Sequence, residues 1–240
     1  MALDTKARLS MNAAGAATQQ QVDVGLRNYM LKVYNYMGSA LALSGVVAFF
    51  VATNQSLQQV IFGTGLMWVF VLAPLGLVFF LSAKIQTMKA STAQTVFWVF
   101  AGMMGISLST ILLQYTGASV ARVFFITAGT FGAMSLYGYT TKKDLTKLGS
   151  LLMMGLIGII IASIVNIFLA SSALHFAISV IGVLVFVGLT AYDTQKIRQM
   201  YYAADSSEVS QKKAIMGALT LYLDFINLFI MLMHLFGQRD

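Results

Sequence analysis

The sequence predicts an all-α polytopic membrane protein with seven transmembrane helices. Hydrophobic residues make up 58% of the 240 positions and charged residues only 10%, whereas a soluble domain carries roughly 25% charged residues. Seven apolar runs, each long enough to cross a bilayer core, follow one another with short gaps. The loops between the runs are alternately basic and uncharged. These observations exclude a water-soluble monomer and an intrinsically disordered chain.

The seven apolar runs follow a polar N-terminal segment. Residues 1–28 contain no apolar stretch of the kind that a cleaved signal peptide requires, so we predict a disordered tail there. A helix needs about 20 apolar residues to cross the bilayer core. The runs that meet this requirement are 30–53, 60–83, 92–114, 118–140, 148–170, 174–195 and 214–236. Residues 29–237 are therefore predicted to form a single membrane domain.

The charge of the connecting segments predicts the orientation of the chain. The segments with Lys and Arg are the N-terminal tail and the loops 84–91, 141–147 and 196–213. The uncharged segments are the loops 54–59, 115–117 and 171–173. Basic loops stay on the cytoplasmic side of a membrane. We therefore expect the N-terminus in the cytoplasm and the C-terminus outside.

Several kinds of site are disfavoured by composition. The chain has no cysteine, which excludes disulfides, Cys-ligated zinc and cysteine nucleophiles. Its two histidines, His175 and His234, are far apart in sequence and cannot form a His-rich metal site alone. The net charge of +7 is explained by the basic loops, so the expected partner is the lipid bilayer and not nucleic acid. We expect no resident cofactor.

Two acidic residues lie inside predicted spans. Asp193 is near the end of the sixth span, in the motif GLTAYDTQK (Gly188–Lys196), and Asp224 is in the middle of the seventh, in LYLDFINLF (Leu221–Phe229). A charged side chain at the bilayer centre costs at least about 2.5–3.5 kcal/mol. Such a residue persists only where it is paired, protonated or in contact with water. Asp193 and Asp224 are therefore the candidate functional residues.

The depth of the two acids is a difficulty for pairing them. Thr220, Asp224 and Asn227 share one helical face, which should turn toward the bundle interior. Asp224 is roughly 15 Å from the inner start of its predicted helix, whereas Asp193 is about one turn from the inner end of its own. The two can meet only if the sixth helix runs deeper or the seventh starts later.

The chemistry of the two acids depends on whether they meet. Two carboxylates about 3 Å apart in a low dielectric cannot both ionise, so they would share a proton and act as a latch. An ionised pair would attract a divalent cation, because carboxylate oxygens are the ligands that calcium prefers. If they do not meet, Asp193 is an interfacial helix end beside Lys196 and Asp224 is a protonated structural acid.

The two acidic motifs resemble the signature of the Bax inhibitor-1 family. A third segment, FGAMSLYGYTTKKDL (Phe131–Leu145), is similar to the fourth-helix segment of bacterial members. The resemblance covers all seven spans and leaves out the N-terminal tail. It implies a fold in which the seventh helix is central and surrounded by the other six, in the inner membrane of a bacterium.

The resemblance also implies a function. In family members the aspartates that match Asp193 and Asp224 form a hydrogen-bonded dyad tied to a pH-sensitive calcium leak. Calcium would then be the transported ion, bound transiently and gated by these two residues. Some members add an arginine of the second helix that latches onto the dyad, and the nearest candidate here is Lys84. Its single point charge would make a weaker latch, and a lysine that reaches to the interface is the alternative.

Two other functions compete with a calcium leak. One is a non-catalytic regulator that binds other membrane proteins, for example a membrane protease. The other is an intramembrane aspartyl protease, since such enzymes also carry aspartates in their sixth and seventh helices. Those enzymes have Gly-x-Gly-Asp and Pro-Ala-Leu motifs, whereas Leu221–Asp224 reads LYLD and the only proline is Pro74. We therefore expect no catalytic residue and no enzyme activity.

Overall fold

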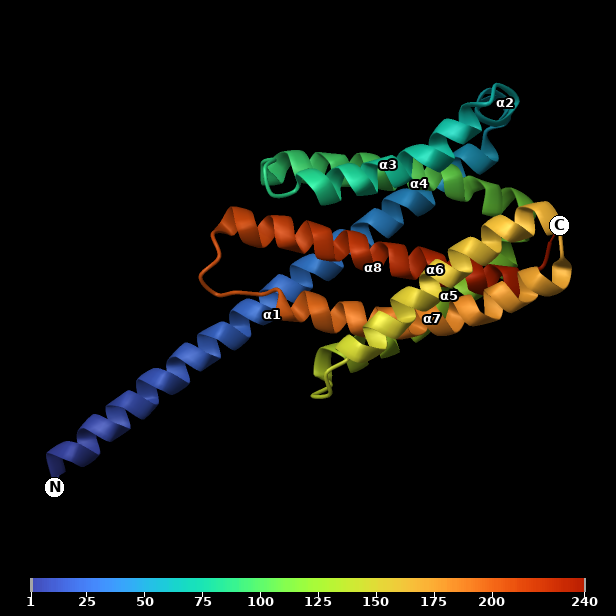
Figure 1. Cartoon of the computed structure of the whole chain (residues 1–240). Coiled ribbons are helices and arrows are strands. Elements are labelled where there is room, and N and C mark those ends of the chain that lie inside the picture. Colours follow the sequence, from blue (N-terminus) through green and yellow to red (C-terminus); the bar gives the residue numbers. More distant parts are fainter. Residues whose placement is uncertain (1, 240) are drawn as a thin grey trace.

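A computed structural model describes the backbone of residues 2–239 and the side chains of residues 22–239 (Figure 1). Within that range the chain is a bundle of helices joined by short connections. The helices are α1 (Ala2–Thr53), α2 (Gln55–Gly63), α3 (Leu66–Lys84), α4 (Ala90–Gln114), α5 (Gly117–Thr140), α6 (Thr146–Leu169), α7 (Ser172–Gln199) and α8 (Ser207–Phe236).

Seven helices of the described part are long and apolar enough to cross a membrane, which confirms the predicted fold class. They are α1 from Val22 onward and α3 to α8. The sixth and seventh predicted spans are thus α7 and α8. The predicted tail over residues 1–28 falls mostly on residues 1–21, whose side chains lie outside the described residues, and it stays a prediction.

The predicted start of the second span is wrong. We placed it at Val60, but Val60 belongs to the short helix α2, which begins at Gln55. The preceding residue, Asn54, caps α2 by accepting a hydrogen bond from the Leu57 backbone on its side chain. The chain then turns at Gly65, whose φ of 75° is in the left-handed region that glycine adopts without strain. The membrane helix α3 begins only after this turn, at Leu66.

The connection between the last two spans is shorter than predicted. We expected a loop over residues 196–213, but α7 continues to Gln199 and α8 begins at Ser207. The Ser206 side chain caps α8 by accepting a hydrogen bond from the Val209 backbone. Both helices therefore carry polar turns beyond their apolar spans.

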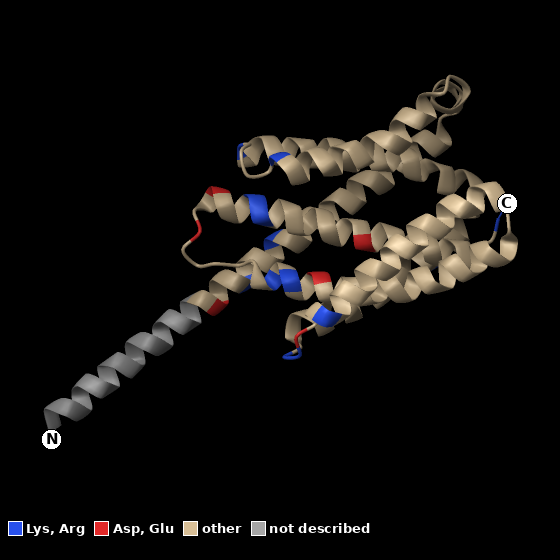
Figure 2. Ribbon diagram, in the orientation of Figure 1, with Lys and Arg blue, Asp and Glu red and all other residues tan. Residues whose placement is uncertain are grey.

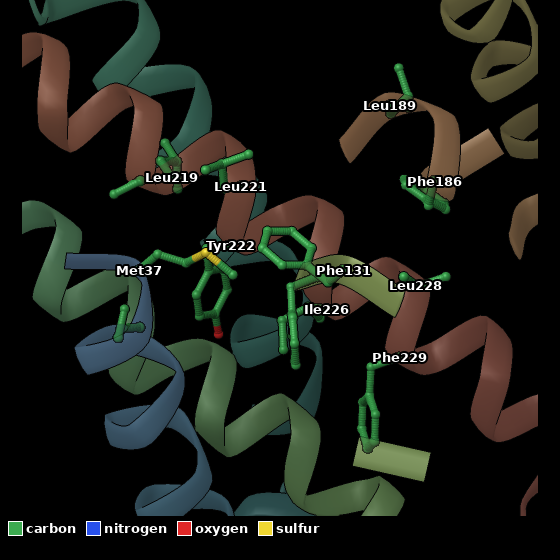
Figure 3. Packing of buried hydrophobic residues seen from close by; sticks show 14 of the residues in the cluster. Met37, Phe131, Phe186, Leu189, Leu219, Leu221, Tyr222, Ile226, Leu228 and Phe229 are labelled. Carbon is green, nitrogen blue, oxygen red and sulfur yellow. The ribbon is translucent and has the colours of Figure 1, made fainter. Parts of the chain in front are cut away.

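Helix α8 is the most buried membrane span. In α8, 67% of the most apolar window is buried, against 39% or less in every other span. Helices α1, α4, α5 and α7 pack directly against α8, while α3 lies outside against α4 and α6 lies outside against α7 (Figure 1). The side chains of Leu221, Tyr222 and Leu228 extend from α8 into this core (Figure 3). The seventh span is therefore central, with four helices in direct contact and two in an outer layer.

Close backbone approaches fix the helices on either side of α8. A Cβ atom on Gly138 of α5 would overlap the backbone of Ala191 on α7, and one on Gly105 of α4 would lie 2.6 Å from the Ser44 carbonyl oxygen on α1. Only glycine permits these separations. The α5–α7 contact at Gly138 lies beside the part of α7 that carries Asp193.

We predict that Gly138→Ala destabilises the protein. The added methyl group meets backbone that cannot move aside, and such overpacking costs about 1–3 kcal/mol. The melting temperature of the purified protein in detergent should fall. Gly129→Ala is the matched control on the same helix, because a Cβ at Gly129 meets nothing within 4 Å. Equal melting temperatures for the two variants would contradict the close approach.

Candidate functional site

The structure brings Asp193 of α7 and Asp224 of α8 together inside the bundle. Their carboxyl groups are neighbours, close enough for a hydrogen bond between them when one carries a proton. Only 8% of Asp193 and 5% of Asp224 is exposed. Figure 2 shows an acidic position midway along α8, away from the charged end of the bundle, whereas the acidic position near the end of α7 is next to basic positions. This pair is the candidate functional site.

The connection between the helices explains how two acids at different depths meet. Asp193 is six residues before the end of α7, and Asp224 is 17 residues after the start of α8. The difference corresponds to about 16 Å of helix. Residues 200–206 span about 25 Å when extended, so α8 can start well beyond the end of α7 (Figure 1). The sixth span extends beyond its predicted end, to Gln199, which is one of the two conditions that we gave for a contact. The seventh span begins at Ser207, before its predicted start and not after it.

The contact between the two carboxyl groups requires a proton. Ionised carboxylates have only acceptor atoms, so a hydrogen bond between them exists only when one is protonated. In addition, Oδ2 of Asp224 is a buried oxygen with no hydrogen-bond partner among the described residues. Two unshielded negative charges at this place would repel each other strongly. The two carboxyl groups can therefore stay in contact when one of them is protonated, whereas they would repel each other when both are ionised.

A chain of hydroxyl groups leads away from Asp193. The next residue, Thr194, is hydrogen-bonded to Ser135 of α5 at 3.0 Å, and Ser135 is bonded to the Tyr34 hydroxyl of α1 at 2.6 Å. Ser135 and Thr194 are buried. This Tyr34–Ser135–Thr194 chain ties three helices together beside the pair.

A second polar contact lies on the other side of the pair. The Tyr222 hydroxyl on α8 is 2.7 Å from Ser44 Oγ on α1, and Ser44 Oγ donates to the Ala101 carbonyl of α4 at 2.7 Å. Figure 3 shows Tyr222 extending from α8 toward these helices. Tyr222 therefore bonds to α1 and not to its neighbour Asp224. Both polar contacts escaped the sequence analysis, because single Ser and Thr residues in an apolar span give no periodic signal.

The other residues of the predicted polar stripe do not join the pair. Thr220 Oγ1 donates to the Met216 carbonyl, and Asn227 Nδ2 donates to the Leu223 carbonyl. Both bonds are within α8 itself. Of the three polar side chains on this face of α8, Asp224 is therefore the one that interacts with a neighbouring helix.

The structure does not bring Lys84 to the pair. Lys84 is exposed in the last turn of α3, and α3 packs against α2 and α4. The charged residue that acts on Asp193 is instead Lys196, one turn further along α7. The Lys196 ammonium lies 5.8 Å from the centre of the Tyr192 ring.

The two histidines, which are far apart in sequence, meet at the other end of the bundle. The ring centres of His175 on α7 and His234 on α8 are 4.6 Å apart. His234 is ten residues beyond Asp224, or about 15 Å along α8. The contact joins the first turn of α7 to the last turn of α8, away from the aspartates along both helices.

The donor set of the site limits what it can bind. Within the described part of the chain, no three His, Cys, Asp or Glu side chains gather where they could hold a metal ion. The aspartate pair offers two carboxylates, whereas calcium takes six to eight oxygen ligands. The two carboxylates are therefore too few, by themselves, to complete the coordination shell of a calcium ion.

Comparison with known proteins gives one family and several bacterial relatives. The family model described as "Inhibitor of apoptosis-promoting Bax1" matches residues 26–240. RP147 of Rickettsia prowazekii is 55% identical over 217 residues, which cover 90% of this chain and 92% of that protein. Inner membrane protein YbhL of Escherichia coli is 48% identical over 222 residues, covering 91% and 95%. The membrane protein SpyM3_0260 of Streptococcus pyogenes is 33% identical over 222 residues, covering 92% and 96%.

The pairing predicts how stability depends on pH. In the wild type, loss of the shared proton places two negative charges in contact, so the melting temperature should fall as pH rises from about 5.5 to about 9. Asp224→Asn supplies a permanent N–H donor to Asp193, so its melting temperature should change less over the same range. The lost hydrogen bond to a charged group corresponds to about 1.5–3 kcal/mol at the alkaline end.

Asp23→Asn is the control for this measurement, because Asp23 is an exposed acid of α1. Its melting temperature should follow the wild-type curve. A wild-type curve that is flat, or one that Asp224→Asn leaves unchanged, would contradict a shared proton.

Proposed function

The chain belongs to the Bax inhibitor-1 family of multi-pass membrane proteins, and on that premise we propose that it is a proton-sensitive calcium leak channel. The observation that carries the proposal is the buried, hydrogen-bonded contact between Asp193 and Asp224. In this proposal the two aspartates are both the gate and the transient calcium site.

The protonated pair corresponds to the closed channel. Its hydrogen bond joins α7 to the central helix α8, and both carboxyl groups are buried. An ion on the cytoplasmic side would have to separate the two helices before it could reach an oxygen. The two hydroxyl contacts, through Thr194 and Tyr222, hold the neighbouring helices in place.

Loss of the proton opens the path in this proposal. Two carboxylates in a low dielectric repel each other, and the same charge attracts a divalent cation. A basic residue that bound the ionised pair would be released by protonation, and the leak would then increase at low pH. The candidate for this role, Lys84, is on the outer helix α3 and does not reach the pair. Lys196 is a basic residue one turn from Asp193, and the titratable hydroxyls of Tyr34 and Tyr222 are engaged in hydrogen bonds. We therefore expect the leak to increase with pH.

The small number of ligands suits a leak. An ion must bind well enough to enter and weakly enough to leave. Two carboxylates without a third acidic or histidine ligand provide weak coordination, with water completing the shell. No tight calcium affinity is expected from the protein at rest.

We place the protein in the inner membrane, with its N-terminus in the cytoplasm and its C-terminus outside. The E. coli relative is an inner membrane protein. Most Lys and Arg residues of the described part gather at one end of the bundle (Figure 2). That end is cytoplasmic under the rule that basic loops stay inside, and the aspartate pair is nearer to it than the histidine pair.

Two other functions, a membrane-protein regulator and an aspartyl protease, can be distinguished from a calcium channel. A regulator that binds other membrane proteins would use the lipid-facing sides of outer helices, and calcium flux separates it from the channel. An aspartyl protease needs room for a peptide beside its acids. The neighbours of Asp224 in the sequence include Leu221, Tyr222 and Phe225, whose bulky side chains are buried in the core, so we propose no enzyme activity.

The test is calcium flux into liposomes that contain the purified protein, measured from about pH 5.5 to about pH 8.5. The wild-type flux should rise with pH, by up to about tenfold per pH unit where the pair titrates. Asp193→Asn and Asp224→Asn should both flatten this rise, because neither variant can form a pair of carboxylates.

Lys84→Gln is the control variant, and it should keep the wild-type pH profile. Wild-type vesicles no leakier than empty ones at every pH would refute the channel and favour the regulator. A profile that changes in Lys84→Gln would show that the lysine takes part in gating after all.

A further inference from the structure

A long groove lies between α1 and α5, two helices that flank the central α8 without packing closely on each other. The cavity has a volume of about 640 Å³, which is within the usual range for a small-molecule site. Its α1 side extends from Arg27 to Gly38 and its α5 side from Phe131 to Tyr139. The length along α1 is about 16 Å. This corresponds to about one leaflet of a hydrocarbon core roughly 30 Å thick.

The walls of the groove are apolar and contain two glycines that packing does not explain. Leu31 and Leu136 are among the side chains that form the walls. Gly38 of α1 and Gly132 of α5 also line the groove, and a Cβ atom on either would meet nothing within 4 Å. These glycines therefore differ from Gly138, which is required by a neighbouring backbone. Their effect is to widen the groove.

The cytoplasmic end of the groove is positively charged. The exposed side chain of Arg27 lines it there. Tyr139 lines the same end, and Arg198 donates a hydrogen bond to the Tyr139 carbonyl at 2.8 Å, with its guanidinium 5.5 Å from the Tyr139 ring centre. A guanidinium group binds phosphate oxygens in a bidentate manner. An apolar channel one leaflet long that ends at arginine matches an acyl chain with an anionic headgroup.

We propose that this groove binds one anionic phospholipid of the cytoplasmic leaflet, with an acyl chain between Gly38 and Gly132 and its phosphate at Arg27. The inner wall of the groove includes Tyr34 and Ser135, the two hydroxyls that lead toward Thr194. A bound chain therefore covers this hydrogen-bond chain from the lipid side. The binding itself does not depend on whether the protein conducts calcium.

The test is a lipid titration of the purified protein in a neutral detergent, followed by native mass spectrometry. Phosphatidylglycerol, phosphatidylcholine and free glycerol phosphate are the three probes. The wild type should retain one phosphatidylglycerol in preference to phosphatidylcholine, and it should not retain glycerol phosphate. Arg27→Gln should weaken the phosphatidylglycerol complex about tenfold or more, through loss of a charged hydrogen bond.

Variants that fill the groove distinguish lipid bound in this site from lipid that surrounds the protein without a specific site. Gly132→Leu should abolish the retained phosphatidylglycerol, whereas Gly158→Leu should keep it, because Gly158 is an exposed position of α6 that also has open space around it. Gly38→Leu is the second filling variant if Gly132→Leu does not fold, as judged by its melting temperature.

Three results would overturn the proposal. The first is that both groove-filling variants, Gly132→Leu and Gly38→Leu, retain as much phosphatidylglycerol as the wild type. The second is equal retention of phosphatidylcholine, or of glycerol phosphate alone. The third is a wild-type dimer that dissociates in Gly132→Leu without change in lipid retention, which would assign the groove to a second copy of the chain.

Discussion

The proposed function depends on one hydrogen bond, which the neighbouring carboxyl groups of Asp193 on α7 and Asp224 on α8 can form. This bond exists only while a proton is shared, because ionised carboxylates have no donor. Burial makes the condition strict, since neither group can turn to water for compensation. The central position of α8 follows from the same constraint: four other membrane helices in direct contact exclude water from its acidic residue.

The surroundings of the pair are built to stay in place while the pair itself can change. Hydroxyl contacts from Tyr34 through Ser135 to Thr194, and from Tyr222 to Ser44, tie α7 and α8 to α1 and α5. Glycine contacts bring backbones to distances that no side chain permits. In the channel that we propose, repulsion between ionised acids would act against this frame, which favours a two-state change over a gradual one.

Much of the fold could be predicted from the sequence, because span length, hydropathy and loop charge are local properties. The two acids also stood out, since an aspartate in an apolar helix is costly. Other features depend on three-dimensional packing. The helix break at Gly65 has no strong hydropathy signal, and the register of Asp193 with Asp224 depends on how far the connection between α7 and α8 reaches. The contact between His175 and His234 likewise joins residues that sequence treats as unrelated.

The shared proton can be observed most directly by infrared spectroscopy of the carboxylic acid carbonyl stretch. We would compare the wild type, Asp193→Asn and Asp224→Asn in lipid, at neutral and at alkaline pH. We predict a protonated carboxyl band in the wild type at neutral pH that disappears on alkalinisation and is missing from Asp224→Asn, because that variant lacks the more deeply buried acid. A wild-type protein without this band at neutral pH, or a band that survives unchanged in Asp224→Asn, would contradict a proton held by the pair.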